Sequence, residues 1–255
     1  MQIKKTILTE SVTLEELRKF IREGRAAEVL TAGDQIYIDF DGAAVPYDVI
    51  GIDVDAPAAK ELKHTVTIQA HELIEEHPFD TKGRYGSNDW ETSELREYLN
   101  SEAYAARYAE LAEYAIPVTK MNTNGRKTVD TFFLLSVDEY NAKSTPYEYY
   151  KDKPYRAAKH AKDDFNDWHR TRSATRGYSF GTWCVTSSGY VDYGGAHDSM
   201  RCAPDCVIQL VTRQPCKSCA LYFNCTRSRI PSRKAKQRRD DTNSLRAARY
   251  TRRGT

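Results

Sequence analysis

Three cysteines near the C-terminus have the spacing of a metal-binding knuckle. Cys216 and Cys219 are separated by two residues, and Cys225 follows six residues later. Thiolates at this spacing can chelate zinc, which takes four ligands in a structural site. The spacing predicts that these three cysteines converge on zinc, and free or disulfide-paired thiols are the alternative. The candidates for a fourth ligand are Cys206, Cys202 and His197.

Two histidines flank an acidic segment in the first half of the chain. His71 and His77 are six residues apart, whereas the zinc-protease motif places its histidines four apart on one helix face. The spacing argues against a metal site, and we expect solvated polar side chains here. The sequence also offers no pattern of a nucleophile paired with a base, and no phosphate-binding loop.

The segment from Tyr178 to Asp198 is rich in Gly, Ser, Tyr, Asp and His. Glycine and serine favour turns, and tyrosine combines a flat apolar face with a polar tip, which suits a contact surface. We expect one exposed ligand-binding cluster, formed by Tyr178, Ser179, Phe180, Tyr190, Asp192, Tyr193, His197 and Asp198. The alternative is an ordinary surface loop whose tyrosines are buried singly.

Apolar runs must anchor this segment in a core. Residues 132–135, 183–185 and 207–210 are apolar and lie between turn residues, which predicts buried strands. Near the N-terminus, apolar and polar residues alternate over 36–40, as in a half-buried strand, and residues 47–54 and 65–68 predict two further strands. Asp41-Gly42 predicts a hairpin turn between the first two.

Helical patterns surround these strands. Thr13 and Glu16 form a capping box for a helix whose apolar face holds Leu14, Leu17 and Ile21, and Gly24 can end it. We expect this helix to pack on the domain that follows or on a neighbouring chain. Residues 88–100 predict a second helix, capped by Asn88 or Asp89, with Trp90 as a packed anchor.

Further along the chain, residues 102–115 predict one continuous helix ending before Pro117. Ser136 and Glu139 form another capping box, which predicts a short helix. Residues 141–167 are polar and rich in tyrosine without clear periodicity, so we expect a long surface excursion. Its tyrosines either join a recognition face or pin the excursion to the body, and we favour pinning. They are Tyr147, Tyr149, Tyr150 and Tyr155.

Five segments together resemble a bacterial and phage domain family. They are residues 85–100, 132–140, 168–173, 188–191 and 201–208, and they begin Tyr-Gly-Ser-Asn-Asp-Trp, Phe-Phe-Leu-Leu-Ser, Trp-His-Arg-Thr-Arg-Ser, Ser-Gly-Tyr-Val and Arg-Cys-Ala-Pro. The family is similar to C-type-lectin-like and formylglycine-generating-enzyme-like folds, including the variable proteins diversified by retroelements. The resemblance implies an α+β fold, a C-type-lectin-like mixed sheet with flanking helices. Residues 202–204 depart from the usual Val-Arg-Pro.

Charge divides the chain unevenly. The chain of 255 residues has a net charge of +2, but residues 213–255 hold thirteen Lys or Arg and two Asp or Glu, a net of +11, which leaves −9 on the rest. We expect a helical segment at 1–30, the lectin-like domain at 31–211 and a Cys-containing basic tail at 212–255 that orders only on a partner. The sequence shows no signal peptide and no membrane span.

The resemblance implies a non-enzymatic recognition protein, either a phage or prophage tail tip or a retroelement-diversified protein, in the virion or the bacterial cytoplasm. Its ligand would be a protein or surface group on a target cell, and it could form oligomers. One alternative is an oxidoreductase like the formylglycine-generating relatives, with active-site cysteines drawn from Cys184, Cys202 and Cys206. Against this, Cys184 and Cys206 lie in apolar strand patterns, where a thiol usually packs as a small hydrophobe. A further alternative function is the binding of nucleic acid, of a different polyanion or of an assembly partner through residues 227–255.

Overall fold

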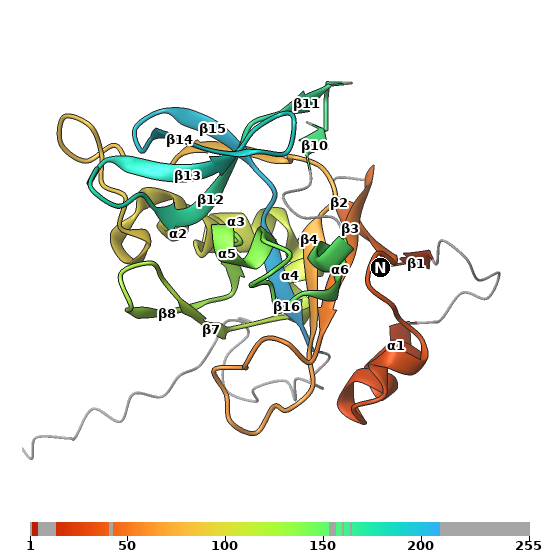
Figure 1. Cartoon of the computed structure of the whole chain (residues 1–255). Coiled ribbons are helices and arrows are strands. Elements are labelled where there is room, and N and C mark those ends of the chain that lie inside the picture. Colours follow the sequence, from red (N-terminus) through yellow and green to blue (C-terminus); the bar gives the residue numbers. More distant parts are fainter. Residues whose placement is uncertain are drawn as a thin grey trace, which may run out of the picture. The chain divides into compact units, whose positions relative to one another are not determined.

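The computed structural model describes residues 2–4, 14–40, 43–152, 157–159, 161–163 and 165–209 (Figure 1). The chain divides into two compact units between Thr212 and Arg213, and the described residues all belong to the first. Several expectations lie outside these residues. They concern the cap at Thr13, the turn at Asp41-Gly42, Tyr155, the strand end at Leu210, the cysteines Cys216, Cys219 and Cys225, and the basic tail.

The described residues form a seven-stranded antiparallel sheet, with the strand order β1-β2-β3-β4-β16-β6 and with β9 also paired to β16. The strands are β1 (Gln2–Lys4), β2 (Gln35–Phe40), β3 (Ala43–Ile52), β4 (Val66–Ala70), β6 (Ala115–Ile116), β9 (Phe132–Phe133) and β16 (Asp205–Ile208). The alternation predicted for residues 36–40 is confirmed, because Ile36 and Ile38 are buried while Tyr37 is partly exposed.

A five-stranded sheet of the described residues has the order β14-β13-β12-β15-β5. Its strands are β5 (Glu75–Pro78), β12 (His169–Ala174), β13 (Gly181–Val185), β14 (Val191–Gly195) and β15 (Ser199–Cys202). This sheet is mixed, since β12 and β15 run parallel while the other neighbours are antiparallel. After β15 the chain continues into β16, so one segment passes from the smaller sheet into the centre of the larger (Figure 1).

Two small hairpins complete the described strands: β7 (Val118–Met121) pairs with β8 (Lys127–Asp130), and β10 (Ala158–Lys159) pairs with β11 (Asn166–Asp167). The helices are α1 (Leu14–Arg22), η1 (Ala26–Glu28), η2 (Trp90–Thr92), α2 (Glu94–Leu99), α3 (Glu102–Arg107), α4 (Ala109–Tyr114), α5 (Val137–Tyr140) and α6 (Glu148–Asp152). The protein is therefore of the α+β class. The helices in the described part of the chain are all too short or too polar to cross a lipid bilayer.

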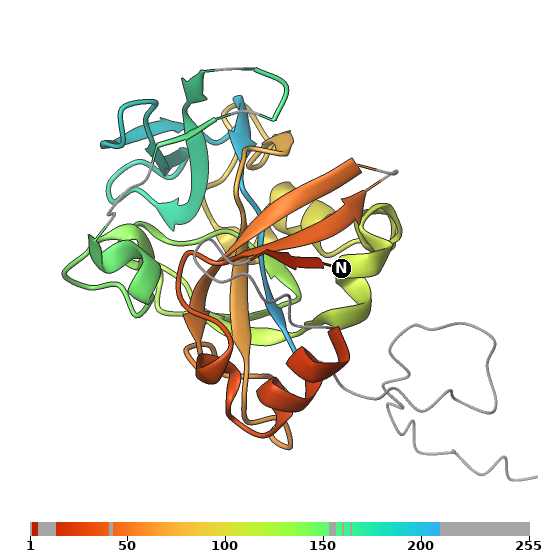
Figure 2. The same ribbon diagram turned by 90° about the vertical axis from the view of Figure 1, so that its right-hand side faces the viewer.

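Helix α1 packs on its own domain, because Leu17 and Ile21 are fully buried in the same apolar cluster as the large sheet. Gly24 has a φ of 72° just beyond the helix, which confirms the predicted left-handed end. The capping box at Ser136 and Glu139 is also confirmed. The five-stranded sheet and α1 lie at opposite ends of this unit (Figure 2).

Two segments that were each predicted as one helix are divided into two helices in the structure. Residues 102–115 form two helices, because the backbone turns at Tyr108 (φ −110°, ψ 47°). The turn accompanies a hydrogen bond of 2.5 Å from the buried Tyr108 hydroxyl to Glu75. Residues 88–100 likewise divide into η2, capped by Asp89, and α2, capped by Ser93. Trp90 is a packed anchor, as expected, at 1% exposure.

The predicted strand over residues 132–135 is shorter than expected. Only Phe132 and Phe133 pair with β16, although Leu134 and Leu135 are also buried. The reason is that the carbonyls of Leu134 and Leu135 instead accept hydrogen bonds from Arg172, at 2.7 Å from its side chain and 3.1 Å from its backbone N–H. Residues 183–185 and 207–208 are strands, but Trp183 is only partly buried.

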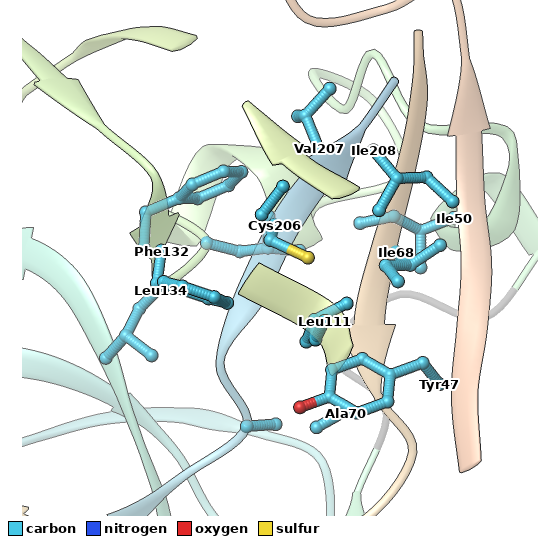
Figure 3. Close-up of a cluster of buried hydrophobic side chains, with 14 of the residues drawn as sticks. Tyr47, Ile50, Ile68, Ala70, Leu111, Phe132, Leu134, Cys206, Val207 and Ile208 are labelled. Atoms are coloured by element: carbon cyan, nitrogen blue, oxygen red, sulfur yellow. The ribbon is translucent and has the colours of Figure 1, made fainter. Parts of the chain in front are cut away.

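The core is built around β16. Figure 3 shows Cys206, Val207 and Ile208 among side chains from β3, β4, α4 and β9, including Ile50, Ile68, Leu111 and Phe132. The described tyrosines of the 141–167 excursion are buried in this body: Tyr147, Tyr149 and Tyr150. Tyr147 is fully buried, and its hydroxyl donates to Asp55 at 2.8 Å. The excursion is therefore pinned, as predicted.

A buried cluster of charges lies between β7, α5 and β12. The Lys120 ammonium lies 2.7 Å from Asp55 and 2.8 Å from Glu139, and Arg172 also pairs with Glu139. These two cations balance these two anions. Asp205 is fully buried nearby, and neither of its carboxyl oxygens has a hydrogen-bond partner within the described structure. Burial raises the pKa of Asp205 well above its ordinary value, which favours the neutral carboxyl.

Replacing Asp205 with asparagine should therefore stabilise the protein at pH 7. In the unfolded chain Asp205 ionises above a pKa of about 3.9, whereas burial holds the folded carboxyl in its protonated form to higher pH. The free energy of unfolding therefore falls as pH rises from the unfolded pKa towards the folded one. We expect Asp205→Asn to raise the free energy of unfolding by on the order of 1–3 kcal/mol at pH 7. The gain should shrink towards pH 4. Urea unfolding of both proteins at pH 7 and pH 4 measures the gain. If Asp205→Asn instead lowers the free energy of unfolding at pH 7, the folded carboxylate is ionised and stabilises the protein.

Candidate functional site

A row of exposed aromatic rings lies at one end of the five-stranded sheet. The rings of Tyr193 and Tyr178 are parallel within 3°, with centroids 6.1 Å apart, and Tyr178 also contacts Phe180 at 6.1 Å. Tyr85 continues the row, with its ring centroid 5.4 Å from that of Phe180 and 6.5 Å from that of His197. We call these five residues the aromatic surface. Tyr178 and Tyr193 are 55% and 56% exposed, so their faces are open to a ligand.

Backbone hydrogen bonds join the loops that carry these rings. Asn88 N–H donates to the Ser179 carbonyl at 2.8 Å, and Asp80 N–H donates to the Ala196 carbonyl at 3.0 Å. Ala196 N–H in turn donates to the Phe180 carbonyl at 2.7 Å. Residues 80–88, 175–181 and 195–198 are thus bonded to one another in a closed set. The aromatic surface therefore rests on one connected frame.

The Asn88 side chain holds the middle of this frame. Its Nδ2 donates to the carbonyls of Thr175, Tyr178 and Gly181, at 3.2, 2.8 and 2.9 Å. Three carbonyl acceptors require an amide nitrogen at this position, which fixes the orientation of the side chain. Asn88 or Asp89 was predicted as a helix cap, and Asp89 is the one that caps η2. Asn88 instead closes the loop that presents Tyr178.

Arg170, on β12, holds the other side of the frame. Its guanidinium is buried and donates to the Gly195 carbonyl at 3.1 Å and to the Asp198 carbonyl at 2.7 Å. It also bonds to the Thr182 hydroxyl. Burial lowers the pKa of Arg170, but an arginine remains charged in proteins. The strong donors of this charged group tie residues 195–198 to β12.

Gly86 sets the direction of the Tyr85 loop. It has a φ of +73°, and a Cβ at this position would lie 2.0 Å from the Asp80 carbonyl oxygen. Only glycine fits such a turn without moving the backbone. Asp80 closes the same loop, because its side chain accepts hydrogen bonds from the N–H groups of Lys82 and Ser87, at 2.9 and 3.2 Å.

All eight residues predicted as the binding cluster are exposed. Six of them lie on or directly beside the aromatic surface: Tyr178, Ser179, Phe180, Tyr193, His197 and Asp198, whose carboxylate is 3.3 Å from His197. The other two are separate. Tyr190 lies in the turn before β14, where the described residues show no ring contact to the row. Asp192 faces the opposite side of β14 from Tyr193, since strand side chains alternate.

The structure adds two residues that the sequence analysis did not assign to the site. Tyr85 lies between Phe180 and His197, and the Arg84 guanidinium carbon lies 4.9 Å from the centre of its ring. The Tyr85-Gly86 pair was a usable signal, because glycine marks turns and loops lie on the surface, where they often carry binding residues. The contact between Tyr85 and Phe180 was not predicted because more than ninety residues separate them in the sequence.

The described cysteines are buried and free. Burial raises the pKa values of the Cys184, Cys202 and Cys206 thiols, which disfavours the reactive thiolate. Within the described residues, no three side chains of His, Cys, Asp or Glu gather as metal ligands. His71 contacts the buried Asp48 at 2.9 Å, and the ring of His77 stacks on Tyr98. Leu73 and Glu75 between them are buried, so the expectation of solvated side chains is wrong for the middle of this segment.

A cavity of about 250 Å³ adjoins the frame through Asn88. Its lining includes Asp89, Asn124 and Arg126, and these polar groups already bond to one another. Asn124 donates to Asp89 at 3.1 Å, and Arg126 pairs with Asp89 and with Glu91, the latter at 2.7 Å. We therefore place the candidate site on the aromatic surface rather than in this cavity.

Comparison with known proteins gives one result. A family model described as a domain of unknown function (DUF6273) matches residues 63–210. The match runs from β4 to β16 and includes the whole five-stranded sheet and the aromatic surface. No curated protein and no solved structure matches the chain.

Proposed function

Because the chain belongs to the DUF6273 domain family, whose description names no activity, we propose a function from its own surface: non-enzymatic recognition of a ligand through the aromatic surface. The single observation that carries this proposal is a row of exposed rings on a hydrogen-bonded frame. Large apolar side chains that cluster on a protein's exterior mark interaction sites more often than isolated ones do.

The composition of the surface supports recognition rather than packing alone. Tyrosine and phenylalanine supply a large contact area with only two side-chain torsions to fix, so binding costs little conformational entropy. His197 and Asp198 add polar groups at one end of the row, and both are about half exposed. Loops fixed by Asn88 and Arg170 avoid the further cost of ordering on binding.

The order of the sequence motifs supports a more specific form of this proposal. We propose a C-type-lectin-like scaffold, of the kind that serves phage tail tips or retroelement-diversified proteins, with a protein or surface group of a target cell as its ligand. Four of the five residues of the aromatic surface lie on loops and Tyr193 lies on β14. This arrangement fits that use, since loops carry binding residues while a rigid body positions them.

A binding selection tests the proposal. The immobilised full-length protein is probed with displayed random peptides, displayed folded domains and a glycan array. We expect at least one ligand that binds the double variant Tyr178→Ala and Tyr193→Ala at least tenfold more weakly, because aromatic residues dominate binding energies at interfaces. Phe165→Ala is the matched control, since Phe165 is 57% exposed but contacts Arg201 instead. If every recovered ligand binds both variants equally, the aromatic surface is not the site.

A further inference from the structure

Strand β14 is an edge of the five-stranded sheet, since within the described residues it pairs with β13 alone. The register shows which of its backbone groups face outward. Thr186 N–H donates to the Tyr190 carbonyl and Ala196 N–H donates to the Phe180 carbonyl, so both ends of the hairpin are hydrogen-bonded pairs. Such pairs alternate with non-bonded pairs along antiparallel strands. The groups of Val191, Tyr193 and Gly195 therefore point away from β13.

Some of these outward groups are already bonded within the chain. Tyr193 N–H donates to the carboxylate of Asp192 at 2.8 Å, and the Gly195 carbonyl accepts from Arg170 and from Asp198 N–H. Among the described residues, nothing bonds to the Val191 N–H, the Val191 carbonyl or the Tyr193 carbonyl, so these three groups are open to a partner. They are spaced as the bonding groups of one more strand would require.

The edge has few of the features that protect sheet edges from pairing. Natural edges are blunted by proline, lysine, bulges or covering segments. The five residue pairs of β13 and β14 follow one another without a bulge, and β14 contains neither proline nor lysine. The opposite edge, β5, reads Glu-Glu-His-Pro, with two carboxylates and a terminal proline. Asp192 is the one charge on β14, and its exposed side chain already accepts the N–H of Tyr193.

We propose that the ligand of the aromatic surface is an extended peptide chain that adds to β14 as a further strand. This inference rests on the proposed function and deepens it by naming the class of ligand. Main-chain hydrogen bonds to Val191 and Tyr193 supply affinity, and alternate side chains of the peptide supply specificity.

The two faces of β14 predict the pattern of the peptide. Tyr193 lies opposite Trp183 in the register and stacks beside Tyr178, so peptide side chains on this face meet aromatic rings. On the other face Asp192 is the nearest exposed side chain, which favours a basic residue in the peptide. Bound peptides should therefore alternate apolar or aromatic residues with Lys or Arg.

The test uses a displayed library of random linear peptides of twelve residues as the probe for the full-length protein. Val191→Pro removes the outward N–H of β14 and leaves its bonds to β13 intact, since proline is tolerated where an edge N–H faces solvent. Val191→Ala is the matched control, because it shortens the side chain and keeps the N–H. We expect recovered peptides to bind Val191→Ala like the original protein and to lose at least tenfold in affinity on Val191→Pro.

A second measurement is independent of whether Val191→Pro folds. Single N-methyl groups placed along a recovered peptide should abolish binding at alternate positions only, because every second amide of a paired strand faces β14. Equal binding of Val191→Pro and Val191→Ala, or N-methyl effects without a period of two, would overturn strand addition.

The outcomes also separate this inference from the proposed function. Recovery of only folded domains or glycans, with binding that depends on Tyr178 and Tyr193, would reject the peptide ligand and leave the recognition surface standing. Peptides that bind the Tyr178→Ala and Tyr193→Ala double variant normally but do not bind Val191→Pro would support strand addition at β14. They would reject the aromatic surface as the binding site.

Discussion

Asn88→Asp should disorder the loop that presents Tyr178 and lower the free energy of unfolding by about 3 kcal/mol. Aspartate has the shape of asparagine but no side-chain N–H, so its carboxylate would face the carbonyls of Thr175, Tyr178 and Gly181. Asn88→Ala leaves these carbonyls without their donor but adds no negative charge, and we expect a loss of about 2 kcal/mol. The order of the two variants is therefore part of the prediction.

Urea unfolding followed by tryptophan fluorescence measures both losses. Asn166→Asp is the matched control, because Asn166 is exposed on β11 and the same exchange there should leave stability nearly unchanged. If Asn88→Asp is as stable as Asn88→Ala, the amide nitrogen does not face the three carbonyls, and the frame of the aromatic surface is assigned wrongly.

Glu139→Gln should be the most destabilising of the substitutions considered, with a loss of about 3–5 kcal/mol at pH 7. The change leaves Lys120 with Asp55 as its one carboxylate among the described residues, at 2.7 Å, beside the Tyr147 hydroxyl at 2.9 Å. Arg172 loses the carboxylate with which it pairs. Breaking a buried ion pair on one side is costly because the other charge stays out of water. Chemical unfolding at pH 7 measures the loss, and Glu148→Gln, at an exposed pair with Lys151, is the control.

The same variant gives a test through pH. Burial alone would raise the pKa of Glu139, but the charges of Arg172 and Lys120 more than offset it and hold the pKa well below its ordinary value. A carboxylate with a lowered folded pKa contributes stability above its unfolded pKa of about 4.3, and this contribution is lost as pH falls further. The gap between the original protein and Glu139→Gln should therefore narrow below pH 4. A constant gap would assign the loss to packing instead.

Features that depend on a few neighbouring residues were predictable from the sequence. The alternation around Ile36 and Ile38 and the capping box of Ser136 and Glu139 need only local spacing, and both are present. The exposure of Tyr178 and Tyr193 follows in the same way, since the glycine-rich and serine-rich segments around them hold few apolar side chains to draw the tyrosines into the core.

Features that join distant segments were not predictable. Asn88 bonds to Tyr178 across ninety residues, and the local pattern offered the ordinary alternative of a helix cap. Tyr85 joins the aromatic surface for the same reason. Asp192 was grouped with Tyr193 because glycine turns were expected to bring the polar residues to one edge. Both residues lie within β14, where side chains alternate, so they face opposite sides. The zinc knuckle at Cys216, Cys219 and Cys225 and the basic tail stay predictions.

The most direct test of the central claim compares affinity and stability in one variant, with Tyr85, Tyr178 and Tyr193 all changed to alanine. The affinity for a ligand from the binding selection and the melting temperature are measured on the same protein. If the rings form a binding surface, the affinity falls at least a hundredfold. The melting temperature should change by less than about 4 °C, because a loss of 1 kcal/mol shifts it by about 2–4 °C in a unit of this size. A large drop in melting temperature with affinity retained in the folded fraction would make the aromatic surface a structural element and contradict the account.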